Sequence, residues 1–372
     1  MIRLTIIHFQ PLEKYPPIVN LLNYLSEKQI ATVVLTTNPP HHLEHYNNDF
    51  HKIHRFPSIN GGSRLRIFQY LAFYIGSIVQ LIKRRPSHLF WIETLSAFPA
   101  IIYYYLKAKK PKLFVHYHEY ESPEEIRNGM YLSHIFHWME KKIYPKLTWM
   151  SHTNQDRMDL FVNDNPEVNP HSLRIMPNYP PKWWKDYSRD YKMLGTPVKL
   201  VYVGALSLET TYFKELLQLI HETNGSLTCD FYSFSIDNKT QSLFDQYKSP
   251  NIRFKGVVSQ TDFPKVISKY HVGLILYKGH IPNYIFNAPN KLFEYLACGL
   301  DVWYPNKMKG PEPYKRDSVY PKVLSIDFED LDSFNWKSAI SREGLKEEKS
   351  AYYCEEVYKE LVEAILTPLS NK

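Results

Sequence analysis

The stretch Asn287–Pro305, which reads NAPNKLFEYLACGLDVWYP, constrains the fold more than any other part of this chain. Pro289 suits the first position of a helix, because a proline lacks the N–H that would be unpaired there. The residues from Asn290 to Cys298 favour a helix, and Gly299 stands where a left-handed helix stop is expected. Because the apolar run Val302–Tyr304 follows directly, the stretch predicts a loop, a short helix and a strand.

The start of this predicted helix is suited to binding a nucleotide. A helix N-terminus has free N–H groups and a partial positive charge, and Lys291 adds a full charge in the first turn. Glu294 follows three residues later and therefore lies on the same helix face. Amides and a cation for phosphate, with a carboxylate for a sugar diol, predict a nucleotide site. The alternative is an ordinary amphipathic helix that buries Leu292, Phe293 and Leu296 and leaves the two charges in solvent.

The sequence PNKLFEYLACGLDVW closely resembles the (P)xKxFEYLAxGxPV motif of glycosyltransferases with the two-Rossmann B-type fold. It is most similar to the motif of the retaining, glycogen-synthase-like (group 1) families. The resemblance implies that Glu294 binds the ribose and that Asn290 and Lys291 lie near the diphosphate. Two positions depart from the pattern. Asp301 stands where the family usually has proline, and Phe286 replaces the first Glu of the family's Glu-x7-Glu pair, which touches the donor sugar.

The fold class implied is α/β, with two Rossmann-like domains whose parallel sheets face each other across a cleft. A length of 372 residues suits two domains. The alternation of strand and helix patterns near the N-terminus independently predicts a parallel, right-handed βαβ unit. We expect an acceptor domain at 1–180, a linker at 181–197, a nucleotide-sugar domain at 198–350, and a C-terminal helix at 351–372 that crosses back to the first domain.

Hydrophobic patterns locate the expected elements. The predicted strands of the first domain are 2–9, 31–36, 89–92, 113–118, 149–153 and 173–177. Those of the second are 198–204, 227–234, 252–254, 272–277, 302–304 and 323–326. Helices are predicted at 18–28, 67–82, 290–298 and 350–366.

Two polar residues end a predicted strand of the first domain. His118 and Glu119 follow the apolar run at 113–117, and active-site groups gather at the carboxyl ends of strands in open α/β sheets. They resemble the His-acid pair of many B-type glycosyltransferases, in which the His meets the donor sugar. Under inversion either residue would serve as the base. The alternative is a pair of surface polar residues.

The phosphate-binding groups of the second domain are incomplete relative to the family. Gly204 ends the strand at 198–204 and allows close approach of the next helix. The Arg and Lys that commonly follow this glycine are missing, so Lys291, or Lys278 in a later loop, must carry more of the phosphate charge. Lys291 is therefore also expected to act in catalysis, by stabilising the leaving diphosphate.

Two further segments of the second domain match family positions. Gly256, Val257 and Val258 lie in a segment similar to the family's F-x-G-x-V, whose backbone commonly pairs with the base. The loop 278–288 takes the position of the donor-sugar loop. Its candidate sugar-binding residues are Lys278, His280, Asn283, Tyr284 and Asn287.

The net charge of +7 is unevenly distributed. Residues 1–180 hold 20 Lys and Arg against 14 Asp and Glu, and the remainder holds 25 against 24. A basic half predicts an anionic partner: nucleic acid, an anionic membrane or a phosphorylated acceptor. The apolar run Ile67–Ile82 is too short to span a bilayer and is followed by Lys83-Arg84-Arg85. It predicts either a helix packed on the sheet or a helix lying at a membrane surface.

These observations favour a hexosyltransferase-type glycosyltransferase that moves a sugar from a UDP- or GDP-linked donor to a hydroxyl of a glycan or lipid-linked acceptor. We expect a role in bacterial cell-surface polysaccharide synthesis, a retaining outcome, and neither metal nor cofactor. The expected location is cytoplasmic or peripheral on the inner face of the membrane, without a nucleic-acid partner; three widely spaced cysteines fit a reducing compartment. The alternatives are a sugar-nucleotide epimerase or hydrolase of the same fold, and a non-catalytic basic binding module.

Overall fold

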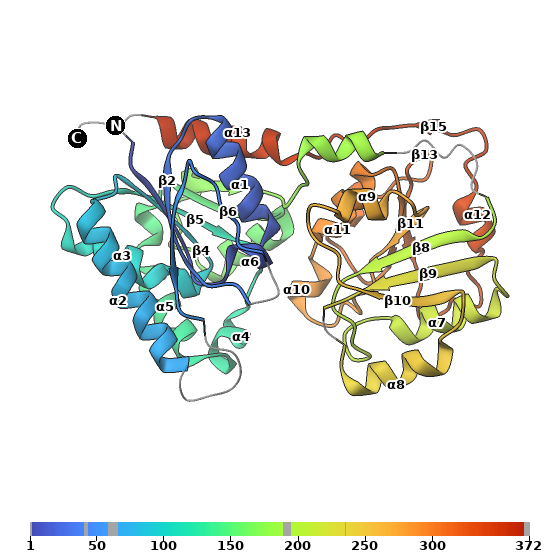
Figure 1. The fold of residues 1–372 in the computed structure, drawn as a ribbon. Coiled ribbons are helices and arrows are strands. Elements are labelled where there is room, and N and C mark those ends of the chain that lie inside the picture. Colours follow the sequence, from blue (N-terminus) through green and yellow to red (C-terminus); the bar gives the residue numbers. More distant parts are fainter. Residues whose placement is uncertain (1, 41–43, 59–65, 189–194, 235, 368–372) are drawn as a thin grey trace. The chain divides into compact units, whose positions relative to one another are not determined.

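The computed structural model describes residues 2–40, 44–58, 66–188, 195–234 and 236–367. The chain divides into two compact units (Figure 1). Unit 1 comprises Met1–Asn178 and Cys354–Lys372, and unit 2 comprises Tyr179–Tyr353. Each unit is an α/β layer structure built on a parallel sheet, as predicted.

The sheet of unit 1 has the strand order β3-β2-β1-β4-β5-β6-β7, and every pairing is parallel. The order reverses between β1 and β4, which makes their carboxyl ends the place where ligands of such sheets bind. Its strands are β1 (Leu4–His8), β2 (Thr32–Thr37), β3 (Lys52–Phe56), β4 (His88–Ile92), β5 (Lys112–Tyr117), β6 (Trp149–His152) and β7 (Leu173–Ile175).

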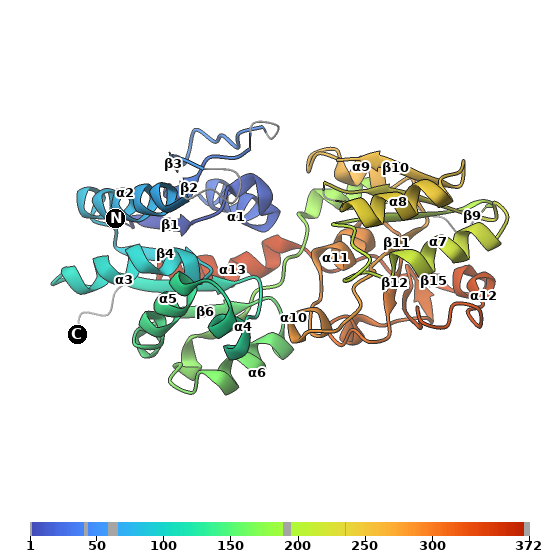
Figure 2. The ribbon, with the colours of Figure 1, turned by 90° about the horizontal axis from the view of Figure 1, so that it is seen from below.

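Helices cover both faces of this sheet. A continuous core joins one face to α2 (Arg66–Arg84), α3 (Ala97–Leu106), α5 (Tyr131–Lys141) and α6 (Gln155–Asp164) (Figures 1 and 2). The short α4 (Pro123–Asn128) precedes α5. Elsewhere in the unit, α1 (Pro16–Glu27) packs against α13 (Cys354–Leu366), where the Tyr358 hydroxyl donates to the carbonyl of Pro17 at 2.8 Å. The last helix of the chain therefore belongs to unit 1.

Helix α2 turns much of its apolar surface outward. It packs on the sheet through Phe73, Tyr74 and Leu81, but Gln69 and Ser77 are also buried on that side. Six large apolar side chains are 45–60% exposed at helical spacing: Ile67, Phe68, Leu71, Ile75, Val79 and Ile82. The helix thus packs on the sheet, as one of the two expectations for this run had it, and it also presents an apolar stripe to the outside. Within the part of the chain that the structure describes, no helix is long and apolar enough to cross a membrane.

Unit 2 is built on a second parallel sheet, with the strand order β10-β9-β8-β11-β12-β14. The order reverses between β8 and β11. Its strands are β8 (Val198–Val203), β9 (Leu227–Tyr232), β10 (Ile252–Gly256), β11 (Val272–Leu274), β12 (Asp301–Pro305) and β14 (Val323–Ile326). A small separate pair is formed by β13 (Val319–Tyr320) and β15 (Lys346–Glu347).

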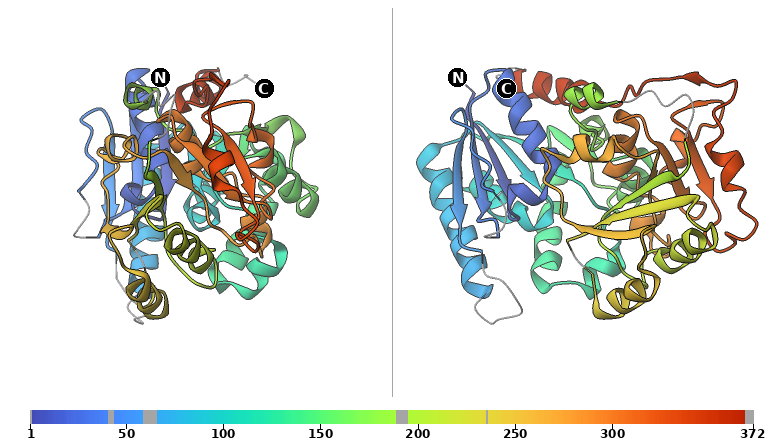
Figure 3. Two further views of the ribbon diagram at one scale, coloured as in Figure 1. Left: turned by 90° about the vertical axis from the view of Figure 1, so that its right-hand side faces the viewer. Right: turned by 45° about the vertical axis from the view of Figure 1, so that its right-hand side comes forward.

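Two apolar cores lie on the two faces of this second sheet. One joins the sheet to α7 (Phe213–Glu222), α8 (Asn238–Tyr247) and α12 (Trp336–Ile340) (Figures 1 and 3). The other joins it to α9 (Phe263–Ile267), α11 (Asn290–Ala297) and a 3-10 segment, Lys182–Tyr187. That segment lies within the stretch predicted as a linker, yet Trp184 is only 1% exposed and its ring lies 5.5 Å from that of Phe263. Residues 189–194 of the predicted linker lie outside the described residues.

Candidate functional site

The predicted phosphate cation and ribose carboxylate meet on α11. The helix begins at Asn290, with Pro289 as its N-cap, and Gly299 takes the left-handed conformation (φ 81°) just beyond its end. Lys291 Nζ lies 2.6 Å from Glu294 Oε2, and the Glu294 side chain is only 4% exposed. The Lys291 ammonium also lies 4.4 Å from the centre of the Phe263 ring. The alternative of an amphipathic helix is right about its buried residues, Leu292, Phe293 and Leu296. It is wrong about Glu294, which is buried and charge-paired, whereas Lys291 is 27% exposed.

The position of α11 is set by a close approach to the sheet. A Cβ atom added to Gly273 on β11 would lie 2.1 Å from the ring of Tyr295 on α11. No larger residue fits there unless the helix moves, so the glycine lets the helix rest directly on the strand. Tyr295 is fully buried at this contact between α11 and β11.

Asp301, which stands where the family usually has proline, has a structural role. Its carboxylate lies 2.9 Å from the Arg342 guanidinium, with both side chains at most 1% exposed. It also accepts the backbone N–H of Lys322 at 2.7 Å. Burial raises the pKa of Asp301, and the charge of Arg342 opposes that rise. This pair ties β12 to the segment after α12, which the sequence motif did not predict.

The loops after β8 and β11 lie together at the point where the strand order reverses. The N–H of Lys278 donates to the carbonyl of Thr210 at 2.9 Å, and its ammonium donates to the carbonyl of Leu208 at 2.7 Å. Gly204 begins the first of these loops; a Cβ atom there would lie 2.8 Å from the Tyr202 hydroxyl. The structure thus brings Lys278 and the loop after Gly204 together, with the ammonium directed at the backbone of that loop.

The predicted donor-sugar loop is partly ordered as α10 (Pro282–Ile285). The ring of Tyr284 stacks on Tyr277 at 5.2 Å and lies 5.5 Å from His280. His280 is exposed, whereas Asn283 and Asn287 are partly buried. Aromatic stacking therefore fixes this loop and leaves its imidazole accessible.

The predicted base-binding segment follows β10. Gly256 has a positive φ of 73°, its carbonyl accepts the N–H of Ser233 at 2.9 Å, and Val257 is 64% exposed. Val258 is partly buried. Nearby on β9, Asp230 is buried and accepts from Arg253 Nε and from the Tyr270 hydroxyl, both at 2.6 Å. Sequence reasoning missed Asp230, although an acid inside an apolar strand is itself a signal.

In unit 1, a chain of hydrogen bonds fixes the proton on His118. Ser151 Oγ lies 3.4 Å from the carbonyl of Val115, to which it donates, and it accepts from His116 Nδ1 at 3.0 Å. His116 Nε2 is then the acceptor for His118 Nδ1 at 3.2 Å. Asn178 Oδ1 accepts from the same Nδ1 at 3.1 Å. His118 Nε2 is left as a buried lone pair with no partner among the described residues.

Burial keeps this cluster uncharged. It lowers the pKa of His118 to about 4, a shift that the hydrogen bond to Asn178 opposes. It lowers the pKa of His152 and of His8, at the ends of β6 and β1, to about 3 each. A neutral His118 with a free Nε2 is suited to accepting a hydrogen bond from a hydroxyl. Glu119, the other predicted residue, is exposed.

Glu93 is a site residue that sequence reasoning missed. It follows β4 and has φ 63° and ψ 156°, a conformation that strains any residue except glycine. Its Oε1 accepts the N–H of His118 at 2.6 Å, and burial and then Glu119 raise the pKa of Glu93 well above its usual value. The available signal was an acid directly after a buried strand, at the same sheet edge as His118.

The titratable residues that the structure describes do not form a metal site. Among the described residues, no group of three or more His, Cys, Asp or Glu could hold a metal ion. The predicted residues fall into two sets: His118 and Glu119 lie in unit 1, and all the others lie in unit 2.

No protein-family model matches this chain, and no curated protein sequence matches it. Solved structures do. The lipopolysaccharide outer core galactosyltransferase WaaB, in its apo form, superposes with a TM-score of 0.65 at 12% identity, over 99% of this chain and 100% of that one. HepE of Anabaena in complex with UDP gives 0.65 at 9% identity, over 98% and 99%. The chain has the B-type glycosyltransferase fold.

This fold is not confined to transferases. The UDP-GlcNAc 2-epimerase of Methanocaldococcus jannaschii superposes with a TM-score of 0.58 at 12% identity, over 97% of this chain and 100% of that chain. The fold predicted from the motif Asn287–Pro305 is therefore confirmed, and activity has to be argued from the residues.

Proposed function

We propose that this protein is a glycosyltransferase that moves a sugar from a UDP- or GDP-linked donor to an acceptor hydroxyl. The observation that carries the proposal is the pair of Lys291 and the buried Glu294 at the start of α11 in a chain of this fold. The pair places a carboxylate and a cation beside a helix N-terminus, as ribose and diphosphate require. That HepE was crystallised with UDP, and also with UDP and glucose, supports the same ligand class.

In this proposal the protein stabilises the leaving diphosphate without a metal ion. Lys291 and the first amides of α11 supply the positive charge as the glycosidic bond breaks. Lys291 must turn from Glu294 toward phosphate, which frees that carboxylate for the ribose hydroxyls. Lys278, whose ammonium donates to the loop after β8, supplies a second cation.

Unit 1 supplies the groups for the acceptor side. His118 Nε2 accepts a hydrogen bond from a sugar or acceptor hydroxyl, and Glu93 fixes the backbone that carries it. In a retaining reaction the leaving phosphate takes the acceptor proton. In an inverting reaction either His118 or Glu119 would serve as the base; burial lowers the pKa of His118 to about 4, so this imidazole is neutral and has a lone pair free, but it holds a proton weakly.

The competing candidate is a sugar-nucleotide 2-epimerase, favoured by the epimerases of the same fold. A thermal-shift screen of nucleotide sugars finds the donor, since a ligand at 100 times its Kd stabilises by about 2.7 kcal/mol. Turnover of that donor is then followed with and without acceptor glycans. Release only with an acceptor supports the transferase, and epimerised donor in its absence overturns it. A non-catalytic binding module would show no nucleotide-sugar stabilisation.

We further propose a lipid-linked or membrane-borne glycan acceptor, a place in bacterial cell-surface polysaccharide synthesis, and a position on the cytoplasmic membrane face. The apolar stripe of α2 and the basic charge of unit 1 support this. Ile75→Ser with Val79→Ser should reduce sedimentation with anionic vesicles and leave nucleotide affinity unchanged. Equal sedimentation of wild type with anionic and with neutral vesicles contradicts it.

A further inference from the structure

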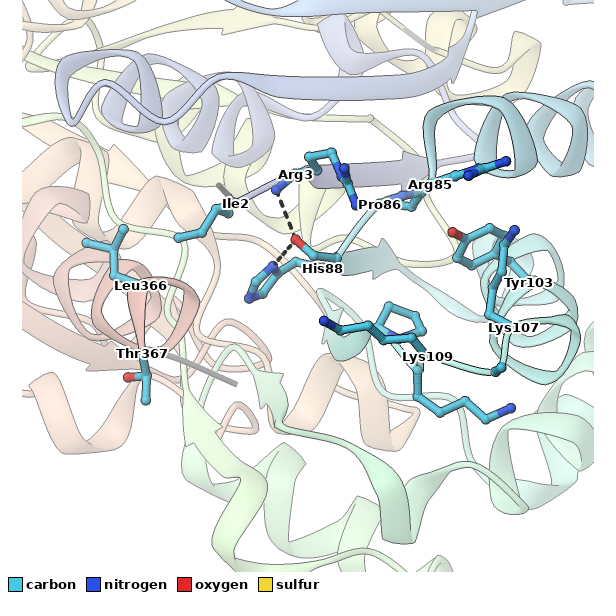
Figure 4. Close-up of a pocket in the computed structure, with 14 residues that line it drawn as sticks. Ile2, Arg3, Arg85, Pro86, His88, Tyr103, Lys107, Lys109, Leu366 and Thr367 are labelled. Carbon is cyan, nitrogen blue, oxygen red and sulfur yellow. Dashed lines mark hydrogen bonds between the residues drawn. The ribbon is translucent and has the colours of Figure 1, made fainter. Parts of the chain in front are cut away.

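A basic pocket lies in unit 1 at the amino ends of β1, β4 and β5, opposite the strand ends that carry His118 (Figure 4). Its cavity measures about 690 Å³. Five cationic side chains line it: Arg3, Arg85, Lys107, Lys109 and Lys110. No Asp or Glu is among the described residues that line it. Like charges gathered without counter-charges repel one another, so the pocket is suited to an anion.

Only some of these cations interact with other groups of the fold. The Lys110 ammonium donates to the carbonyl of Tyr104 at 2.9 Å, which caps the end of α3, and Lys107 lies 5.4 Å from the centre of the Tyr103 ring. In contrast, the guanidinium groups of Arg3 and Arg85 have no acidic partner within the described residues. These two arginines supply charge that the fold itself does not use.

Arg85, which lines the pocket, has an unfavourable backbone conformation. It follows α2 with φ 51°, and its N–H donates to the carbonyl of Leu81 at 2.9 Å. Glycine is the usual residue at this left-handed position, which is unfavourable for residues with a side chain. His88, which lines the pocket, is 3% exposed, and its Nε2 has no partner among the described residues. The lining therefore includes a buried imidazole as well as the cations.

An exposed apolar side chain, Leu366, lines the pocket and is 51% exposed. Two more lie close to lining residues in the chain but do not line the pocket themselves. Leu106, next to Lys107, is 63% exposed, and Ile82, three residues before Arg85, belongs to the outward stripe of α2. A cationic cavity with an exposed apolar side chain in its lining matches a phosphate group attached to an apolar body, since guanidinium groups bind phosphate in a two-pronged geometry.

We propose that this pocket is a second ligand site, distinct from the nucleotide site, and that it binds the phosphate group of an anionic lipid. The ammonium and guanidinium groups bind the phosphate oxygens, and Leu366 contacts the acyl region. This site does not depend on the transferase proposal, because its residues lie at the opposite edge of the unit 1 sheet from His118.

The test compares the double variant Arg3→Gln with Arg85→Gln against a matched control, Lys28→Gln with Lys52→Gln. The control also removes two exposed cations from unit 1, but outside the pocket. Each protein is titrated with vesicles of phosphatidylcholine, with and without phosphatidic acid, and separately with inorganic pyrophosphate. Nucleoside diphosphate affinity, measured alongside, reports on the nucleotide site and on folding.

We expect the pocket variant to bind phosphatidic acid vesicles about thirtyfold more weakly than wild type, and the control to differ little from wild type. If only pyrophosphate binding is lost, the pocket takes a soluble phosphate compound and the lipid is overturned as its ligand. If the pocket and control variants bind both probes equally, the pocket is not a phosphate site. Unchanged nucleoside diphosphate affinity in every variant shows that any loss is local.

Discussion

The buried acids of the two units have different kinds of partner. In unit 2 each such acid has a cationic partner: Asp301 has Arg342, Asp230 has Arg253, and Glu294 has Lys291. In unit 1, His118 and Glu140 are held by neutral hydrogen-bond partners. Burial then shifts their pKa values toward the uncharged form. At these residues, therefore, unit 2 places a counter-charge beside each buried acid, whereas unit 1 surrounds Glu140 and His118 with neutral hydrogen-bond partners.

The buried ion pair of unit 2 should give the largest effect. Asp301→Ala leaves the Arg342 guanidinium buried without a counter-charge, which typically costs 3–5 kcal/mol. Urea unfolding measures the loss, and Asp332→Ala, at an exposed position, is the matched control. Asp301→Asn combined with Arg342→Met should recover most of the stability. A loss below about 1 kcal/mol for the single variant would show that the pair is not what holds β12.

The unit 1 counterpart is Glu140, which is buried and accepts from the Tyr117 hydroxyl at 2.7 Å and from Trp91 Nε1 at 2.9 Å. Burial raises the pKa of Glu140 to about 7, and these hydrogen bonds oppose the rise. Because the pKa is raised in the folded state, the contribution of Glu140 is fully present below about pH 4 and is lost as the pH rises through 7.

The stability of the Glu140→Gln variant relative to wild type should therefore increase as the pH is raised. Between pH 4 and pH 8 the difference in unfolding free energy should shift by about 3 kcal/mol in favour of the variant. Chemical denaturation at several pH values measures it, with exposed Glu124→Gln as the control. A pH-independent difference would mean that Glu140 stays charged, and the contrast between the units would fail at this residue.

Variants of Lys291 and Glu294 test whether the charges of unit 2 serve nucleotide binding. Glu294→Ala should weaken nucleoside diphosphate binding by about 1.5–3 kcal/mol, the range for charged hydrogen bonds. Lys291→Ala, which removes the other half of the same pair, should lower turnover more than binding, because diphosphate charge grows in the transition state. Calorimetry and kinetics separate the two variants. Unchanged affinity in Glu294→Ala removes this residue from the site.

The smallest expected effect is at His118. His118→Ala should lower kcat/KM about tenfold, the equivalent of one hydrogen bond, without changing the pH profile between 6 and 8. The reason is that its pKa of about 4 leaves it neutral over that range. His171→Ala, at an exposed site in unit 1, is the control. Loss of a pH-dependent limb near neutrality in the variant would show that His118 titrates as a base.

Local patterns in the sequence predicted most of the fold. The strand predicted at 323–326 is β14 without change, and Gly299 ends α11 in the left-handed conformation. The strand β3 was missed, because Lys52–Phe56 carries charged and polar residues and pairs with β2 only through the folded sheet. Periodicity located α2 but could not show which side faces out, since its buried side includes Gln69 and Ser77.

The candidate site was predictable only where a local motif encodes it. The spacing of Lys291 and Glu294 placed them on one helix face, and the structure joins them. Glu93 and His118 are 25 residues apart and meet because β4 and β5 are neighbours, and the acid lacks a motif of its own. The Asp301–Arg342 pair spans 41 residues and forms because the segment after α12 packs against β12. Contacts that depend on sheet order cannot be read from spacing.

The assignment of α13 to unit 1 has a consequence for how the chain folds as it is made. Unit 2 is one uninterrupted segment, whereas unit 1 needs a helix that is synthesised only after unit 2 is complete. The contact between Tyr358 and Pro17 joins residues 341 positions apart. Until Cys354–Leu366 has been made, the part of α1 that packs against α13 is uncovered, and chaperones can hold that surface in the meantime. Synthesis therefore closes unit 1 last, although its sheet is made first.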